Sequence, residues 1–284
     1  MKNLAEKLMK LVFLVCAVTS VIAVILICLF LFANGFPAIA EIGPLKFLLG
    51  KNWAPNDVPA AFGILPMILG SIIITAGAVI IGVPVGILTS VFMAKYCPKP
   101  LYRFLKPATE LLAGIPSVVY GFFGLVVLVP FVKNAFGGNG NSILTASILL
   151  GIMILPTIIG VSEAAIRSVP DSYYEGALAL GATHERSIFS VILPAAKSGV
   201  FASLVLGIGR AIGETMAVIM VAGNQPMLPK GILKGIRTMT ANIVIEMSYA
   251  ADLHREALIA TGVVLFVFIL VINVAFSLIK REQN

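Results

Sequence analysis

An arginine and a glutamate, Arg210 and Glu214, interrupt an otherwise apolar stretch of the chain that reads GIGRAIGETMAVIM. A charged side chain at the centre of a bilayer costs about 2.5–3.5 kcal/mol on insertion scales, so such residues are functional candidates by default. The planar guanidinium of arginine can bind two oxygens of an oxyanion at once. Glutamate repels a fully ionised anion but accepts a hydrogen bond from an anion that keeps a proton. Hydrogen phosphate keeps a proton at neutral pH and sulfate does not, so this pair is suited to phosphate.

A structural role is the alternative for this pair. The two residues are four apart, and on a helix their side chains could neutralise each other. An ion pair explains how the cost is reduced but not why it was incurred, because two leucines would be cheaper in lipid. We therefore predict that Arg210 and Glu214 line a substrate path.

The helix that must position this pair is the apolar segment 198–222, in which Arg210 lies near the middle. On a continuous helix, one face would carry Ser203, Gly207, Arg210, Glu214 and Ala217. Gly209 and Gly213 would lie nearly opposite, where a neighbouring helix can approach closely. We expect the charged face to line a cavity and the glycine face to pack against a helix.

The composition places these residues in a membrane protein. The chain is 59% hydrophobic and 12% charged, whereas a soluble domain is about 25% charged. The net charge of +7 could indicate nucleic acid, but the basic residues lie between apolar segments and form no dense tract. The three cysteines and two histidines lack the spacing of a disulfide or a metal site. We expect no nucleic-acid partner and no bound metal.

Six apolar segments are each long enough to cross a bilayer, which takes about 20 helical residues. They are 11–33, 64–94, 107–131, 143–161, 198–222 and 257–279. The second would be about 46 Å long, so we expect a kink or break at Gly82 or Pro84. Pro116 and Pro156 are expected to interrupt the third and fourth. The sequence therefore predicts an all-α integral membrane protein with six transmembrane helices.

The N-terminal segment resembles a signal peptide in following three lysines. Its apolar core exceeds the usual length of about 7–15 residues and no small-x-small cleavage site follows, so we expect a retained helix. With the N-terminus inside, 12 Lys and Arg fall on inner segments and 7 on outer ones, Arg210 completing the 20. This bias predicts a multi-pass protein of the cytoplasmic (inner) membrane with both termini in the cytoplasm. We expect residues 1–62 to form the first helix and an outer connection, and 63–284 a five-helix core.

The inner loop 162–197 is too long for a simple connection. Pro170 suits the first turn of a helix, and Gly181 suits the position after its end. An apolar face is provided by Tyr173, Ala177 and Leu180. The loop therefore predicts a short amphipathic cytosolic helix, which needs a surface to cover that face.

This loop resembles the EAA loop of ABC importer permeases, E-A-A, three residues, G, nine residues, I-x-L-P. The matching residues are Glu175, Ala177, Gly181, Leu193 and Pro194, whereas Gly176 replaces alanine and Val191 replaces isoleucine. In that family the loop forms a coupling helix that docks on an ATPase, which implies coupling roles for Glu175, Gly176, Ala177 and Gly181. The alternative is a helix on lipid headgroups or against its own bundle.

ATP binding by this chain is not expected, because it contains no G-x-x-x-x-G-K-[ST] loop. If ATP drives transport, a separate ATPase subunit hydrolyses it. We expect no catalytic residue and no cofactor on this chain, which is therefore not expected to be an enzyme.

Three motifs resemble the PstC-type permeases of phosphate ABC importers: AGIPSVVYGFFGL at 113–125, GRAIGETMAVIMVAGN at 209–224 and IRTMTANIVIEM at 236–247. The resemblance implies a type I ABC importer permease fold, with Arg210 and Glu214 as the charged pair implicated in phosphate passage. It also implies a second permease (PstA type), two ATPase subunits (PstB type) and an extracytoplasmic phosphate-binding protein (PstS type).

The outer connections 34–63 and 223–256 are candidates for the landing surface of that binding protein. The second of them carries Lys230, Lys234 and Arg237. Other functions remain open. They are a permease for sulfate, molybdate or phosphonate, an ion-coupled carrier or channel, and a phosphate-sensing scaffold.

Overall fold

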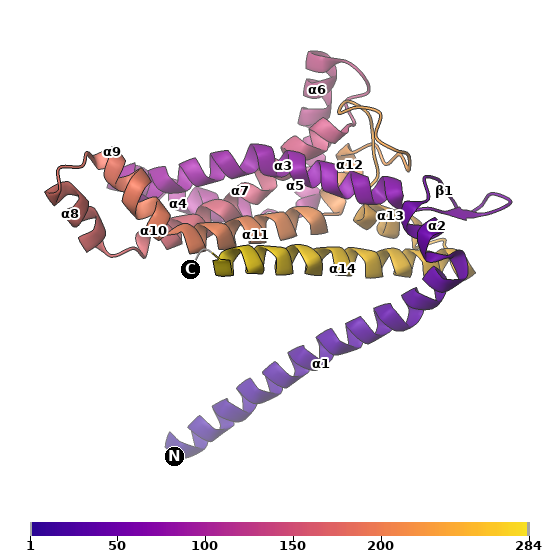
Figure 1. The fold of residues 1–284 in the computed structure, drawn as a ribbon, viewed down its shortest axis with the longest axis horizontal. Helices are drawn as coiled ribbons and strands as arrows, with labels where there is room; N and C mark the ends of the chain where they lie inside the picture. The colour runs from indigo at the N-terminus through magenta and orange to yellow at the C-terminus, as the bar shows by residue number, and fades with distance from the viewer. Residues whose placement is uncertain (1, 283–284) are drawn as a thin grey trace.

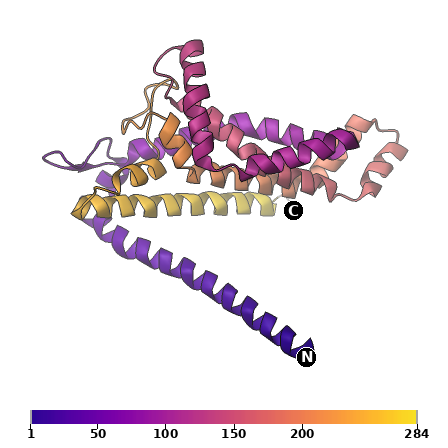
Figure 2. The ribbon, with the colours of Figure 1, turned by 180° about the vertical axis from the view of Figure 1, so that it is seen from behind.

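The computed structural model describes the backbone of residues 2–282, and it is built almost entirely of helices (Figure 1). The side chains of residues 2–5, 277 and 279–282 lie outside the described part, including basic residues at both ends that entered the charge count. The long helices are α1 Lys2–Ile42, α3 Leu65–Val91, α7 Ile143–Arg167, α11 Lys197–Gly213 and α14 Asp252–Glu282. Helices α3, α7, α11 and α14 run alongside one another, while α1 meets α14 near one end and diverges from it (Figures 1 and 2).

Shorter elements lie at the two ends of this bundle and across it. They are α2 Pro44–Leu49, β1 Trp53–Ala54, β2 Ala61–Phe62, α4 Lys99–Gly114, α5 Ser117–Phe123, α6 Val129–Phe136, α8 Asp171–Ala179, α9 His184–Ser187, α10 Leu193–Ala195, α12 Met216–Val221 and α13 Met239–Glu246, with π-helical turns η1 Phe92–Tyr96, η2 Gly124–Leu128 and η3 Ile188–Ile192. Strands β1 and β2 pair antiparallel. One end of the bundle carries α8 and α9, and the C-terminal end of α14 and the N-terminal end of α1 point toward the same side, with α1 well away from the bundle (Figure 1). The opposite end carries α2, β1 and α13.

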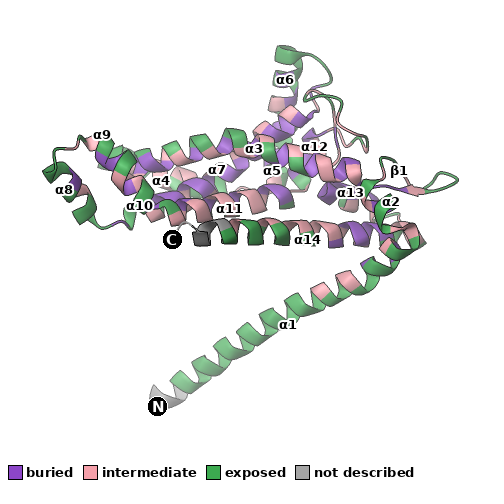
Figure 3. Cartoon of the chain, viewed as in Figure 1, coloured by how far each residue is buried: buried purple, intermediate pink, exposed green. Residues whose placement is uncertain are grey.

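The centre of the bundle is α7, which is apolar around most of its circumference and largely buried (Figure 3). Glycines let α3 approach it closely. A Cβ atom at Gly82 would lie 2.8 Å from both the carbonyl oxygen of Gly151 and the Ile154 side chain, closer than such contacts normally come. By contrast, the apolar side chains of α1 are exposed along most of its length (Figure 3), which suits a helix that faces lipid.

Within the described residues, five helical segments are long and apolar enough to cross a membrane. They are Glu6–Ile42, Leu65–Tyr96, Ser117–Phe136, Ile143–Arg167 and Asp252–Phe276. A sixth is obtained only if His184–Ala195 and Lys197–Gly213, which are bent by 69°, are taken as one broken segment. The all-α prediction is confirmed, but the fifth expected segment, 198–222, is not one continuous helix.

The prolines act differently from place to place. Pro116 does interrupt the third segment, because Ile115 before it is extended and α4 ends at Gly114, as the steric clash with a following proline favours. Neither Pro84 nor Pro156 ends its helix, so the helix does not break at Gly82 or Pro84 and is not interrupted at Pro156, whereas a kink at Gly82 or Pro84 stays a prediction. Neighbouring groups can satisfy the backbone that a proline frees inside a packed membrane helix. The irregular end of the second segment is the turn η1 instead.

Helix α7 also runs past the expected end of the fourth segment, from 161 to Arg167. The cytoplasmic loop expected at 162–197 therefore begins only after this residue. The third expected segment changes too, because its first part belongs to α4, a separate helix with no buried residue. The division of the chain at residue 62 stays a prediction.

Candidate functional site

Arg210 lies in the last turn of α11 and is half-buried. Its Nη1 donates a hydrogen bond to the hydroxyl of Thr157 on α7 at 3.2 Å. Among the residues whose side chains the structure describes, no carboxylate lies within ion-pair distance of this guanidinium. Its positive charge therefore remains available to an anion.

Glu214 lies just beyond the end of α11, in extended backbone with φ −68° and ψ 134°. Its Oε1 accepts a hydrogen bond from the backbone N–H of Ala217 at 3.2 Å, and so caps the start of α12. Its carbonyl oxygen accepts a hydrogen bond from the hydroxyl of Thr240 at 3.0 Å. The helix is thus broken at the glutamate, and α12 continues after the break.

This break corrects two expectations about the pair. Arg210 and Glu214 do not share the face of one helix, and no ion pair joins them among the described side chains. Mutual neutralisation therefore does not explain why both are present. Arg210 lies in the last turn of α11, and Glu214 lies at the break that follows this helix.

The glycines of α11 also pack differently from the expectation. A Cβ atom at Gly209 or Gly213 would meet no heavy atom of the described structure within 4 Å, whereas one at Gly207 would lie 3.1 Å from Ile158 of α7. The hydroxyl of Ser203 bonds that of Ser162 on α7 at 2.7 Å. The face of α11 that carries Ser203 and Gly207, expected to line a cavity, therefore packs on α7. The face that carries Gly209 and Gly213, expected to pack against a helix, is open in the described structure.

The predicted helix of the inner loop is confirmed as α8, with Pro170 as its N-cap residue. Gly181 has φ +83°, the left-handed conformation that commonly ends a helix, and its N–H donates to the Leu178 carbonyl at 2.9 Å. Of the expected apolar face, Ala177 is buried, but Tyr173 and Leu180 are 51% and 90% exposed. The surface of this chain therefore covers only part of that face.

Glu175 and Gly176 are exposed on α8, and Gly181 is exposed beyond it. A Cβ atom at Gly176 would meet no described heavy atom within 4 Å, so an alanine would fit there. Helix α8 is tied to the next turn through the hydroxyl of Tyr174, which lies 2.7 Å from Nδ1 of His184. These residues form one small exposed helix at the end of the molecule, clear of the bundle (Figure 1).

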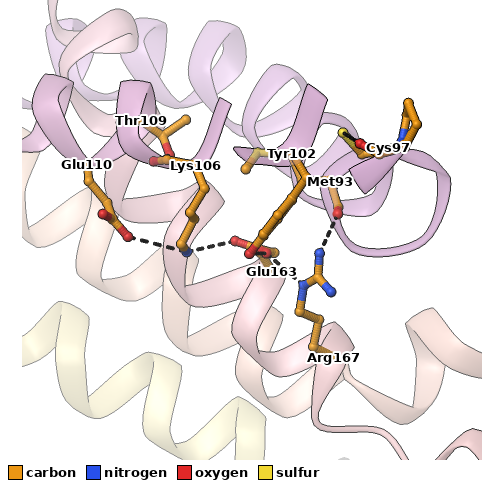
Figure 4. Close-up of polar contacts among 9 residues, drawn as sticks. Met93, Cys97, Tyr102, Lys106, Thr109, Glu110, Glu163 and Arg167 are labelled. Carbon is orange, nitrogen blue, oxygen red and sulfur yellow. Dashed lines mark hydrogen bonds and ion pairs between the residues drawn. The ribbon is translucent and has the colours of Figure 1, made fainter. Parts of the chain in front are cut away.

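A cluster of charged residues at the C-terminal end of α7 escaped the sequence analysis (Figure 4). Glu163 is only 1% exposed. Its Oε1 accepts from Tyr102 Oη and Arg167 Nε, both at 2.7 Å, and its Oε2 accepts from Lys106 Nζ at 2.8 Å. Glu163 and Arg167 are four residues apart, which is a usable signal on a helix, but both lie in the segment 162–197 that the sequence predicts to be a loop.

The partners on α4 are held in the ionisation states that this cluster needs. The hydrogen bond to Glu163 raises the pKa of Lys106, against the opposing effect of burial. The hydrogen bond that Tyr102 itself donates to Glu163, together with burial and the charge of Glu163, raises the pKa of Tyr102. Both groups therefore keep their protons at neutral pH and donate to the carboxylate.

The opposite end of the molecule contains a second buried carboxylate, Glu246. Its Oε2 accepts from the indole N–H of Trp53 at 2.8 Å and lies 2.9 Å from Nε2 of His254, while its Oε1 pairs with Arg237. Arg237, expected on an exposed landing surface, is instead turned inward. Lys230 and Lys234 are exposed at this end of the molecule, where they help to line a pocket of about 350 Å³.

The fold is that of the type I permeases of ABC importers. The solved structure of a bacterial alginate ABC transporter, in complex with an alginate pentasaccharide-bound periplasmic protein, contains a chain that superposes with a TM-score of 0.66 at 17% identity, covering 95% of this chain and 94% of that one.

The chain belongs to the family of binding-protein-dependent transport system inner membrane components, whose pattern matches residues 82–283. It is 39% identical to a probable ABC transporter permease, YqgH, of Bacillus subtilis, over 96% of this chain and 91% of the relative. It is 35% identical to the phosphate transport system permease PstC of Mesorhizobium japonicum, over 88% and 83% respectively. The protein is therefore a membrane permease subunit of an ABC importer.

Proposed function

We propose that this chain is the permease subunit that carries inorganic phosphate through the cytoplasmic membrane in an ATP-driven importer. The observation that carries the proposal is the half-buried guanidinium of Arg210, which has a hydroxyl partner but no carboxylate partner among the described side chains. A deep cation without a counter-ion is costly in a membrane unless an anion visits it. Similarity to permeases named for phosphate transport supports phosphate as that anion.

The division of labour between the two charged residues follows from their geometry. Arg210 contacts the phosphate oxygens through the N–H groups that Thr157 leaves free. Glu214 faces the path at the helix break, where its second carboxylate oxygen accepts the proton of hydrogen phosphate. Because Glu214 forms no ion pair with Arg210 among the described side chains, both charges can act on the substrate.

The remaining subunits complete the importer. A second permease of the PstA type forms the other wall of the path, and two ATPase subunits of the PstB type hydrolyse ATP, so this chain is not itself an enzyme. Helix α8, with Glu175, Gly176, Ala177 and Gly181, docks on one ATPase. The exposure of Tyr173 and Leu180 supports this docking, because an apolar face on a small helix needs a covering surface.

The orientation follows from the same assignment. If α8 is cytoplasmic, then the N-terminal end of α1 and the C-terminal end of α14 are cytoplasmic too, since both point toward the side of the molecule that carries α8 (Figure 1). The opposite end then faces outward and receives the phosphate-binding protein of the PstS type on its exposed surface, including Lys230 and Lys234. Arg237 stabilises that surface from below through its pair with Glu246.

Another oxyanion, such as sulfate, molybdate or phosphonate, is the second candidate substrate. The observation that favours it is that an arginine fork accepts any oxyanion, and permeases of this fold serve substrates as different as alginate. An ion-coupled carrier or channel is the weaker alternative, because such proteins usually place several ionisable groups along their helices.

The test is uptake of radiolabelled anions by liposomes that contain the assembled complex and enclosed ATP, supplied with the binding protein outside. The proposal predicts accumulation of phosphate that requires ATP and that excess sulfate does not suppress. Accumulation of sulfate or molybdate in place of phosphate would select the second candidate. Phosphate flux that persists without ATP would indicate a carrier or channel.

A further inference from the structure

The buried carboxylate of Glu163 lies outside the proposed substrate path, yet it accepts three hydrogen bonds from other side chains. It lies on the last full turn of α7 and binds two residues of α4 and one of its own helix (Figure 4). Taking a charge out of water is expensive, and well-packed apolar residues would often serve stability as well or better. The arrangement therefore calls for a role beyond simple cohesion.

The attachment of α4 depends on this carboxylate. None of the residues of α4 is buried, so apolar packing against this chain contributes little to holding that helix. Its polar ties to α7 are the hydroxyl of Tyr102 and the ammonium of Lys106, and both end on Glu163. The Tyr102 ring also lies against the Arg167 guanidinium, 4.4 Å from ring centroid to Cζ. Glu163 thus anchors α4 to α7.

The same cluster lies at the start of the loop that carries α8. Arg167 is the last residue of α7, and α8 begins at Asp171. The Arg167 Nη2 also donates to the Met93 carbonyl in η1 at 2.7 Å, which ties the end of α3 to this point. The ends of α3 and α7 and the body of α4 are therefore joined where the coupling loop leaves the bundle.

In the other direction, α4 leads to the helix break beside Arg210. Helix α4 ends just before Pro116, and Tyr120 on α5 spans this bend by donating to the Leu112 carbonyl at 2.8 Å. Helix α5 packs closely on α12, since a Cβ atom at Gly121 would lie 2.9 Å from the Cα of Ala217. Ala217 is the residue whose N–H is capped by Glu214. A chain of direct contacts thus connects the coupling loop to the substrate path.

We propose that Glu163 is the positioning residue that makes α4 move together with the coupling loop, so that ATPase motion at α8 reaches the helix break at Glu214. The proposal rests on the proposed function, because it takes α8 as the ATPase contact. Chains of packed side chains and hydrogen bonds that have two discrete arrangements can carry coupling energy between distant sites. Without the carboxylate, α8 still binds the ATPase but α4 no longer follows it.

The experiment uses the complete complex in liposomes with Glu163→Gln and Lys106→Met, alone and combined. Three quantities are measured: the ATPase that co-purifies, the rate of ATP hydrolysis, and the phosphate accumulated per ATP hydrolysed. We expect normal ATPase retention and substantial hydrolysis, with uptake per ATP lowered about tenfold, a typical size for a coupling effect. The double variant should be no worse than Glu163→Gln, because both substitutions break one link.

Glu110→Gln is the matched control. Glu110 is on the same helix and faces the same Lys106 at 3.9 Å, but its side chain is 66% exposed, so its loss should leave uptake per ATP unchanged. An unchanged ratio of uptake to hydrolysis in both variants, whether or not the two rates themselves fall, would overturn the proposal and leave a purely structural anchor. Lys106→Met keeps the test valid if Glu163→Gln fails to assemble, since Glu163 then retains its other two partners.

Failure of this proposal is distinguishable from failure of the proposed function. If the unaltered complex transports a different anion, the ratio of uptake to hydrolysis is measured with that anion and still tests Glu163. If the unaltered complex needs no ATP for transport, the proposed function fails and the coupling role fails with it. An unchanged ratio in a complex that imports phosphate normally removes the coupling role alone.

Discussion

Replacing Arg210 is the perturbation that most directly tests the proposed substrate path. A guanidinium has about five N–H donors, and one of them is used by Thr157 at 3.2 Å. The remaining N–H groups can donate hydrogen bonds to two oxygens of the same anion. Arg210→Lys keeps the charge but loses the planar fork, whereas Arg210→Leu loses both.

The size of each effect follows from this count. A hydrogen bond to a charged group contributes about 1.5–3 kcal/mol, and about 1.4 kcal/mol corresponds to a factor of ten. Loss of one of two such bonds in Arg210→Lys should therefore lower transport efficiency by about 10- to 150-fold. Loss of both bonds in Arg210→Leu amounts to about 3–6 kcal/mol, so uptake should fall below detection.

The assay is the initial rate of ATP-dependent phosphate uptake as a function of phosphate concentration, with protein level and ATP hydrolysis measured on the same samples. Because no carboxylate among the described side chains pairs with Arg210, removing it leaves no orphaned buried acid, and assembly should be normal. Normal phosphate uptake by a well-assembled Arg210→Leu complex would mean that Arg210 does not contact the substrate. A loss of uptake that merely tracks a loss of assembled protein would also contradict the prediction.

Glu214→Gln completes the series. Glutamine can still cap α12 at Ala217, so the helix break should persist and abundance should not change. Removal of the negative charge should raise sulfate uptake relative to phosphate, because the repulsion against a fully ionised anion disappears. Lower abundance with an unchanged ratio of the two anions would instead favour a structural role for the glutamate.

Further predictions concern the coupling helix, the packing of the bundle and the outer surface. Gly181→Pro should uncouple transport while the helices stay inserted, because proline cannot adopt φ +83° and lacks the N–H that caps α8. Gly176→Ala is the control and should transport normally. Normal import by the Gly181→Pro variant would exclude this coupling role. Gly82→Val should destabilise the complex by about 1–3 kcal/mol or more through overpacking, seen as a lower melting temperature, and an unchanged melting temperature would contradict the close contact of α3 with α7. A cysteine at Lys230 should cross-link to the binding protein and one at Lys99 should not; equal capture would mean that the orientation is wrong.

The inner loop shows how far local sequence signals reach. The start and end of α8 were predictable because Pro170 and Gly181 restrict their own backbone, whatever surrounds them. The long apolar helices were predictable for a similar reason, since apolar length alone selects a membrane helix. The bends and ends of these helices were less predictable. Of Pro84, Pro116 and Pro156, only Pro116 interrupts its apolar segment.

The break at Glu214 could not be read from the pattern, because α11 and α12 are both apolar and only Glu214 and Thr215 separate them. Glycine lowers helix propensity by about 1 kcal/mol, but Gly207 and Gly213 carry the same cost and only the second lies at the break. What holds the break is distant in sequence, namely the hydroxyl of Thr240 on the Glu214 carbonyl. The Glu163 cluster escaped for the same reason, as Tyr102 and Lys106 lie about sixty residues away.

The central claim is that this permease couples ATP hydrolysis to phosphate import, and the most direct measurement is ATP hydrolysis by the co-purified complex in liposomes. Its rate is followed as the binding protein is added empty, with phosphate, or with sulfate. We expect strong stimulation by the phosphate-loaded binding protein, and little stimulation by the empty binding protein or by the binding protein supplied with sulfate. Hydrolysis that is indifferent to phosphate, or that rises equally with sulfate, would contradict the central claim.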